Sequence, residues 1–435
     1  MSPSRRRPAL VLTAVSALLA ACVTGCGPGA RDTNASDARP GTAERPGTAP
    51  GTKAPAPEPG GGLGDILVAG RPVTGSQASG IPKAPFKRTY TEGELYAPVT
   101  GYRSMAFGAV GLEAVFREEL DAGKDVATTI DPAVQRAAFD GLRGRQGAAV
   151  VLDADSGRIL GQVSTPSYDP NSFSGNLKSD ERAWNQLKDQ GFDGPLTNRA
   201  IRHVDNPGSA VHVVVAAAAL EKGLIASVDA PTRSPAVHTA ADSTAEFAGD
   251  PAHCTDASLR TALRHACANV FARIASDLGA DALASTAVAF GFNQDKTDTP
   301  LRAFESTWPR KPENPAQLAL MANGLFEVKA TPIQMAMVTA VLANGGNRVR
   351  PSLVTDPRTP VPAERAVSQR TAEQLQSALG DSSSAWVPSA SVTWATSSAR
   401  TPAGRRLAVA VCLSSPTDAT AEATPLARHL AAAGQ

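Results

Sequence analysis

The chain has 435 residues, of which 42% are hydrophobic and 5% aromatic, so it can bury a sizeable core, and its length suggests two or three domains. Lysine and arginine number 42 against 41 acidic residues, which gives a formal net charge of +1. Such a balance provides no field for a nucleic acid or an anionic surface. Composition and charge therefore argue against nucleic acid as a partner.

The first 26 residues have the layout of an export signal. Three arginines precede an apolar run over residues 9–21, which is too short to predict a membrane span and is followed by small residues. Leu-Ala-Ala-Cys22 resembles a bacterial lipobox, in which the cysteine becomes the lipidated mature N-terminus, and Val-Thr-Gly-Cys26 is a weaker second match. An ordinary cleaved signal or a short anchor helix is the alternative. Residues 1–26 are therefore expected to be a lipoprotein signal peptide, with a lipid on Cys22 or Cys26 anchoring the protein outside the cytoplasmic membrane.

Three further cysteines are Cys254, Cys267 and Cys412. Export permits disulfides, and Cys254 and Cys267 are the only pair close in sequence, closing a loop that would contribute about 3 kcal/mol. His253 and His265 beside them could suggest zinc, but the spacing matches no common zinc site. A disulfide between Cys254 and Cys267 is therefore expected, with no metal and no cofactor.

Residues 27–62 contain proline, glycine, alanine and threonine with scattered charges and almost nothing large and apolar. Such a segment cannot offset the entropy of ordering, so we expect a disordered, flexible tether. A small N-terminal module is predicted over residues 63–125. It should contain two short strands around Ala-Gly within residues 65–73 and a short helix over residues 112–120.

The larger domain, residues 126–435, begins with a helix that Asp131 caps and that has Pro132 at its first position. Apolar residues 147–153, a turn at 155–157 and a second run over 158–163 form a hairpin signature.

Helices are expected later in this domain, at residues 209–222, 258–278, 281–290, 315–322, 332–344, 371–379 and 425–433. Thr371 and Gln374 form a Thr-x-x-Gln capping box for the sixth of them. Late strands are expected at residues 391–399 and 407–413. A hairpin, a block of helices and then strands predict an α+β fold in which both ends of the domain contribute to one sheet.

Seven segments spread along the chain resemble the penicillin-binding proteins, the serine acyltransferases that cross-link peptidoglycan, and in particular their actinobacterial class B members. They cover residues 95–102, 128–131, 164–171, 195–200, 291–293, 330–336 and 343–346, in the family's order. The resemblance extends over most of residues 63–435. It implies the penicillin-binding-protein and serine β-lactamase-like transpeptidase fold, an antiparallel sheet flanked by helices.

The first family motif, Ser-x-x-Lys, aligns with Ser209-Ala210-Val211-His212. In the family the serine attacks a carbonyl and the lysine assists as a base. Here the nucleophile remains and His212 replaces the lysine, on the same helix face because residues i and i+3 are neighbours. A neutral imidazole with an ordinary pKa is a competent base for a serine.

The second family motif, Ser-x-Asn, moves a proton and contacts the substrate amide. It aligns with Ala266-Cys267-Ala268, so both functional side chains are missing. Asn269 lies one residue further on, which on a helix turns it by about 100° from the required direction.

The third family motif, Lys-Thr-Gly, lies on a strand beside the serine and binds the substrate carboxylate. One alignment places it at Ala395-Thr396-Ser397, where only the threonine survives. In a second alignment residues 394–397 belong to the strand that follows, and the motif strand is deleted. The cationic triplet is absent in both.

With three motifs altered together, Ser209 is interpreted as a vestigial nucleophile that serves as a helix N-cap, and His212 as a residue filling the space of the lysine. The resemblance then implies an inactive or impaired transpeptidase homologue with a scaffolding, sensing or regulatory role in cell-wall synthesis. Its implied partners are cell-wall synthesis proteins or peptidoglycan peptides. The alternative is a residual serine acyltransferase or hydrolase, acylated at Ser209 by β-lactams or stem peptides with His212 as base.

Overall fold

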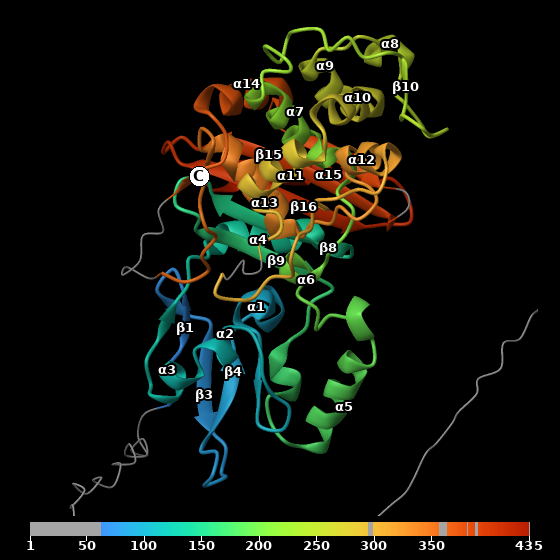
Figure 1. Cartoon of the computed structure of the whole chain (residues 1–435). Helices are drawn as coiled ribbons and strands as arrows, with labels where there is room; N and C mark the ends of the chain where they lie inside the picture. The colour runs from blue at the N-terminus through green and yellow to red at the C-terminus, as the bar shows by residue number, and fades with distance from the viewer. Residues whose placement is uncertain (1–61, 295–298, 356–362, 381, 388–389, 435) are drawn as a thin grey trace, which may run out of the picture. The chain divides into compact units, whose positions relative to one another are not determined.

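The computed structural model describes residues 62–434 except 295–298, 356–362, 381 and 388–389 (Figure 1). The predicted signal peptide, both candidate lipidation sites and nearly all of the tether lie outside the described residues. Within the described part of the chain, no helix is long and apolar enough to cross a membrane.

A five-stranded antiparallel sheet forms the centre of the larger domain. Its strands, in spatial order, are β14 (Ser382–Val387), β15 (Val392–Arg400), β16 (Arg406–Ser414), β8 (Gln146–Asp153) and β9 (Ile159–Thr165). The predicted hairpin supplies β8 and β9, and the end of the chain supplies the other three. The α+β class and a sheet assembled from both ends of the domain are therefore confirmed.

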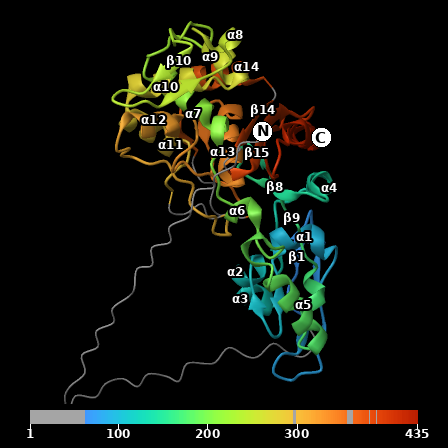
Figure 2. The same cartoon turned by 90° about the vertical axis from the view of Figure 1, so that its right-hand side faces the viewer.

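Alternation along the strands gives the sheet two apolar faces. In β8, Val150 belongs to the core on one face and Val151 to the core on the other. Helices α4 (Pro132–Leu142) and α15 (Thr420–Ala433) cover the Val151 face, and α13 (Pro332–Ala343) covers the opposite one. Figure 2 shows α4 and α13 on opposite sides of the sheet. This is the predicted sheet flanked by helices.

Caps explain where several helices begin. The Asp131 side chain accepts hydrogen bonds from the backbone N–H groups of Ala133 and Val134, as predicted for α4. The capping box predicted at Thr371 and Gln374 is wrong, because Ser368 caps α14 (Gln369–Leu379), which begins two residues earlier. The Gln374 side chain instead accepts a hydrogen bond from the N–H of a residue in a different loop.

A group of helices lies on the side of α13 that faces away from the sheet. They are α7 (His212–Glu221), α8 (Pro251–Cys254), α9 (Leu259–His265), α10 (Ala268–Leu278), α11 (Ala280–Ala289) and α12 (Pro315–Ala322). Short elements complete the domain, namely α6 (Arg199–Arg202), β10 (Val237–Thr239), β11 (Glu246–Ala248), β12 (Asn347–Arg348) and β13 (Glu364–Arg365). Of these helices, α12 has its predicted range and α11 lies within one residue of it, whereas α7 begins three residues later than predicted and α8 was not predicted.

The single helix predicted over residues 258–278 is wrong, because the chain breaks between α9 and α10. Ala266 has φ 50° and ψ 46°, a left-handed conformation that ends α9, and Cys267 precedes α10 with a non-helical ψ of 90°. Cys267 is joined to Cys254 by a disulfide with a Cα–Cα distance of 5.4 Å. The bond fixes Cys267 at the break, where a continuous helix would carry its side chain in a different direction.

The small module consists of short elements. They are β1 (Ile66–Val68), β2 (Arg71–Pro72), β3 (Thr74–Ala78), β4 (Phe86–Tyr90), α1 (Gly93–Thr100), β5 (Arg103–Ser104), β6 (Gly108–Ala109), α2 (Leu112–Val115), α3 (Arg117–Asp121) and β7 (Val126–Ala127). The predicted strands around Ala69 and Gly70 form, with both turn residues at positive φ. The single helix predicted at 112–120 is wrong, since Phe116 at φ −103° and ψ 30° separates α2 from α3.

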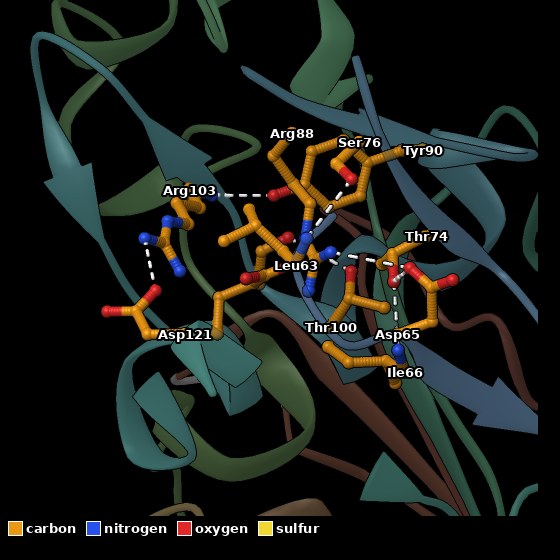
Figure 3. Close-up of polar contacts among 12 residues, drawn as sticks. Leu63, Asp65, Ile66, Thr74, Ser76, Arg88, Tyr90, Thr100, Arg103 and Asp121 are labelled. Atoms are coloured by element: carbon orange, nitrogen blue, oxygen red, sulfur yellow. Dashed lines mark hydrogen bonds and ion pairs between the residues drawn. The ribbon is translucent and has the colours of Figure 1, made fainter. Parts of the chain in front are cut away.

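Arg88 belongs to a buried ion pair of this module, and Figure 3 shows the polar contacts around it. Arg88 Nε lies 2.5 Å from Glu113 Oε1, and both side chains are fully shielded from solvent. Arg88 also reaches Asp65 at its partly exposed edge, and Arg103 pairs with Asp121 nearby. Burial raises the pKa of the Glu113 carboxyl, and the Arg88 charge opposes that rise. The module therefore depends on a charge pair in which neither partner can be removed alone without cost.

The chain returns to the small module after β9. Residues of η1 (Pro170–Phe173) and α5 (Lys178–Lys188) pack with Tyr102 in an aromatic cluster that includes Phe173 and Trp184. Both views show α5 beside the small module (Figure 1 and Figure 2). The core of the module thus draws on residues that lie well after its last strand.

Candidate active site

Ser209 lies in a 3-10 turn, η3 (Gly208–Val211), that leads directly into α7. Gly208 has φ 55°, and its N–H donates to the carbonyl of Gly324 at 3.1 Å. A Cβ on Gly208 would lie 2.7 Å from Val387 Cγ2, so glycine allows β14 to approach the serine turn. The backbone before α7 is therefore held between the edge strand of the sheet and the chain around residue 324.

The Ser209 hydroxyl does not cap a helix, so the predicted N-cap role is wrong. The side chain is half-buried and forms no hydrogen bond with any described residue. The physical reason is the 3-10 turn, which places Ser209 inside η3 and makes Val211, two residues later, the residue that precedes α7. The Ser209 hydroxyl therefore has no part in starting α7.

His212 is buried, with 2% of its surface exposed. Its ring stacks on Phe271 of α10, with 3.8 Å between the centroids and 18° between the planes. Its Nε2 lies 3.0 Å from Oδ1 of Asn323, just after α12. Burial lowers the pKa of the imidazole from its ordinary 6.5 to about 3, and the Asn323 contact opposes that fall only in part. At neutral pH the ring is uncharged.

The hydrogen bonds of Asn323 assign the tautomer of His212. Its Nδ2 donates to the carbonyls of Ala319 and Ala268, at 2.9 and 3.3 Å, so its Oδ1 is the acceptor. The proton of His212 therefore resides on Nε2. The lone pair on Nδ1 is buried and has no hydrogen-bond partner among the described residues.

The positions of the second motif do not restore the missing side chains. Ala268 is brought to the site, but it contributes only its backbone carbonyl to Asn323, and Ala266 is exposed at the helix break. Cys267 is occupied by its disulfide to Cys254. The Asn269 amide donates instead to the carbonyls of Pro235 and Cys254, at 2.7 and 2.8 Å, and so stabilises the loop that the disulfide closes.

The structure of the sheet shows that the first alignment of the third motif, at residues 395–397, is wrong. Ala395 packs in the core on the α4 and α15 face, whereas Ala210 of η3 belongs to the core on the other face. Because side chains alternate along β15, Ser397 shares the direction of Ala395, and only Thr396 faces the η3 side. The first alignment therefore cannot place a cation and a glycine beside Ser209.

The second alignment assumed that the motif strand is deleted, and this is also wrong. β14 lies beside β15 at the edge of the sheet and contacts the serine turn. Its sequence, Ser-Ser-Ser-Ala-Trp-Val, contains no lysine, threonine or glycine. The strand survives with a different sequence, which a search for the triplet could not recognise.

Sequence reasoning missed the two residues that define the environment of His212. Asn323 lies 111 residues away from it in sequence, and no periodic pattern connects the two. The only available signal was the Ala-Asn-Gly turn that ends α12. Phe271 lies 59 residues from His212 in sequence, and no local pattern links the two.

The two histidines considered for zinc, His253 and His265, stack on each other with 4.0 Å between ring centroids. His253 Nδ1 also lies 2.8 Å from the carboxylate of Asp250. Their cysteine neighbours are joined in the disulfide and are not free as thiolate ligands. Among the described residues no group of three or more histidine, cysteine and acidic side chains could hold a metal ion.

A five-stranded antiparallel sheet with helices on both faces, and a serine turn opening a buried helix beside its edge strand, define the class of serine acyltransferases that react with penicillin. The chain belongs to the penicillin-binding protein family. The penicillin binding protein transpeptidase domain matches residues 147–386, and the penicillin binding protein A dimerisation domain matches residues 63–145. The resemblance drawn from the sequence is thereby confirmed.

Mycobacterial proteins are among the similar sequences. The peptidoglycan D,D-transpeptidase PbpA of Mycobacterium tuberculosis is 35% identical over 332 residues, which are 67% of this chain and 66% of that protein. PbpA of Mycolicibacterium smegmatis is 33% identical over 324 residues, covering 68% of this chain and 65% of the relative. This chain thus matches just under two thirds of the length of these relatives.

Similar solved structures include penicillin-binding protein A from M. tuberculosis as its imipenem acyl-enzyme complex. It has a TM-score of 0.77 and 30% identity, and the match covers 85% of this chain and 98% of that one. The penicillin G acyl-enzyme complex of the same protein has a TM-score of 0.76 at 30% identity, over 86% and 99% of the two chains. Both confirm the transpeptidase fold.

Proposed function

We propose that this chain is a catalytically silent penicillin-binding protein homologue that acts in cell-wall synthesis by binding, as a scaffold, sensor or regulator. The environment of His212 is the observation that carries the proposal. This residue takes the place of the family's lysine, yet it is buried, neutral and bound to Asn323.

The lowered pKa makes His212 a poor base. A catalytic base works best when its pKa is near the operating pH. A shift from 6.5 to about 3 makes the imidazolium less favourable by about 5 kcal/mol, because each pKa unit corresponds to about 1.4 kcal/mol. Accepting the proton of Ser209 would form that imidazolium beneath Phe271, where it has no carboxylate partner among the described residues.

Losses at the other two motifs support the same conclusion. Alanine at 266 and 268 offers no group that could relay a proton, and β14 has no cation that could bind a substrate carboxylate. A general base alone raises the reaction rate about 10²- to 10⁴-fold, and stabilisation of the charge that develops in the transition state usually contributes more. The retained fold is therefore the functional part of the molecule.

The relatives named peptidoglycan D,D-transpeptidases suggest where such a protein acts. We infer peptidoglycan stem peptides or cell-wall synthesis proteins as partners, on the outer side of the cytoplasmic membrane. A lipid on Cys22 or Cys26 would keep the protein at that membrane. Export also agrees with the disulfide between Cys254 and Cys267, since such bonds persist in oxidising compartments.

A second candidate function is slow acylation of Ser209 by β-lactams or stem peptides. Two observations favour it: the Ser209 hydroxyl has no competing hydrogen bond among the described residues, and Asn323 holds His212 in the tautomer that leaves Nδ1 able to accept a proton. The penicillin G and imipenem acyl-enzymes of M. tuberculosis penicillin-binding protein A are the precedent in the family.

A fluorescent penicillin distinguishes the two candidates. The purified protein is incubated with it for minutes to a day, and covalent label is measured by denaturing gel and intact mass. An active penicillin-binding protein serves as the positive control and Ser209→Ala as the matched negative one. We expect no label above that of Ser209→Ala. A labelled wild-type protein with an unlabelled Ser209→Ala variant would refute the silent function and establish the second candidate.

The anchor is tested separately by mass analysis of the mature N-terminus. We expect a diacylglyceryl cysteine at position 22 or 26, with cleavage before it. Cys22→Ala and Cys26→Ala, made singly, identify the residue, since only one of them should release the protein from the membrane fraction. An unmodified N-terminus in the wild type would refute the lipid anchor.

A further inference from the structure

A groove of about 650 Å³ lies where the small module meets the larger domain. Its walls come from α1 and α2, from the segment that contains α6, and from residues 300–304. Both views show α1, α2 and α6 close together (Figure 1 and Figure 2). Neither Ser209 nor His212 lines it.

The groove gathers exposed apolar side chains. The described residues include eight large hydrophobic side chains that are exposed, and four of them line this groove. They are Val110 and Phe304, each 40% exposed, Val115 at 49% and Phe192 at 55%. Concentration of such side chains around one hollow is a mark of a binding surface, whereas scattered single ones are ordinary.

The charge of the groove is of one sign. Among the described residues that line it, Arg202 and Arg302 are the only charged ones, and there is no lysine, aspartate or glutamate. The Arg202 guanidinium lies over the Phe304 ring, 4.7 Å from its centroid. Arginine and aromatic residues are enriched in protein interfaces, from which lysine and acidic residues are depleted. An occupant should therefore combine apolar anchors with carboxylates.

The N-terminal part of this chain does not meet that requirement. Residues 27–61 contain no large apolar side chain, so they provide no anchor. The apolar run over residues 9–21 contains no acidic residue and follows three arginines, which the two groove arginines would repel. The N-terminal part of the chain is therefore not the occupant of the groove.

We propose that this groove docks a segment of a partner protein that presents apolar anchors beside aspartate or glutamate. The anchors fill the space between Val115 and Phe304, and the carboxylates pair with Arg202 and Arg302. This inference goes beyond the silent function proposed above. Since the groove excludes Ser209, the penicillin experiment neither supports nor weakens it.

Photo-crosslinking in the cells that make the full chain tests the proposal. A benzophenone amino acid replaces Val115 in one variant and Phe304 in another, and a third carries it at Leu177, which is 66% exposed and lies outside the groove. We expect one protein to be crosslinked from both groove positions and not from position 177. Its crosslinked peptide should carry acidic residues next to apolar ones.

Charge-reversal variants test whether the two groove arginines pair with acidic residues of the partner. With the crosslinker at position 115, Arg202→Glu combined with Arg302→Glu should lower the yield about fivefold or more, as expected for two exposed charge pairs. The matched double lysine variant should retain most of it. Crosslinks to lipid alone, to a second copy of this chain, or to no protein above the position 177 control would overturn the proposal. An unchanged yield in the charge-reversed variant would do so as well.

Discussion

Replacing His212 by glutamine should make the stability of this protein less sensitive to acid. A histidine in the unfolded chain takes up a proton below its ordinary pKa of 6.5, whereas the buried imidazole does so only below about 3. Between these values the unfolded state binds more protons, so the free energy of unfolding falls as the pH falls. The contribution of His212 is thus complete above pH 6.5 and is lost progressively towards pH 3.

The size of the effect follows from the same pKa. Because pH 5 lies 1.5 pH units below 6.5 and each unit corresponds to about 1.4 kcal/mol, the free energy of unfolding should be about 2 kcal/mol lower at pH 5 than at neutral pH. Glutamine has no proton to gain, and its amide can still donate to Asn323. The variant should be less stable than the wild type at pH 7 because it loses the stacking on Phe271, but it should be less sensitive to acid.

Urea unfolding at pH 7, 6 and 5 measures both effects. The change in unfolding free energy from pH 7 to pH 5 should be about 2 kcal/mol larger in the wild type than in His212→Gln, with all other titrating groups cancelling in the comparison. His429→Gln, at an exposed histidine on α15, controls for the loss of one imidazole. A difference below about 0.5 kcal/mol, within the error of extrapolation, would refute the buried, neutral state of His212.

Three further predictions concern stability. Replacing Cys254 and Cys267 together by serine should lower the unfolding free energy by about 3 kcal/mol, a loss that thiol reduction of the wild type should match and that an equally stable variant would contradict. Arg88→Met should lower the free energy of unfolding by about 3 to 5 kcal/mol, because it leaves the buried Glu113 carboxylate unpaired, and adding Glu113→Leu should recover much of that loss. Additive losses from the two substitutions in urea unfolding would argue against the ion pair. Gly208→Ala should lower the melting temperature by several degrees, because its φ is positive and β14 leaves no room for a Cβ, and an unchanged melting temperature would argue against the close approach of β14.

Local signals in the sequence predicted four of the five strands of the central sheet and several of the helices around it. Asp131 and Pro132 marked the start of α4, and the alternating apolar runs with a glycine turn marked the β8 and β9 hairpin. In each case the residues that determine the element lie within a few positions of one another. The order of elements then limited the fold to a sheet made from both ends of the domain.

Errors arose where distant contacts determine the conformation. Ala266 is an ordinary helix residue by propensity, yet the chain breaks there, next to Cys267 and its disulfide to a cysteine thirteen residues earlier. The serine-rich sequence of β14 gave no strand signal, and the strand is held by pairing along its whole length with residues 392–397 of β15. The neutral state of His212 depends on Phe271 and Asn323, which no local pattern links to it.

The contacts around His212 determine what a lysine at position 212 would do. Three helices meet at its ring, because Phe271 stacks on it from α10 and Asn323 binds it from the end of α12. A lysine restored here would place an ammonium group in a space that now fits a neutral ring, where burial disfavours its charge. Reverting this single codon would therefore destabilise the protein before it could recover chemistry. Recovery of a Ser-x-x-Lys motif would therefore need compensating changes at Phe271 or Asn323 as well as the lysine itself.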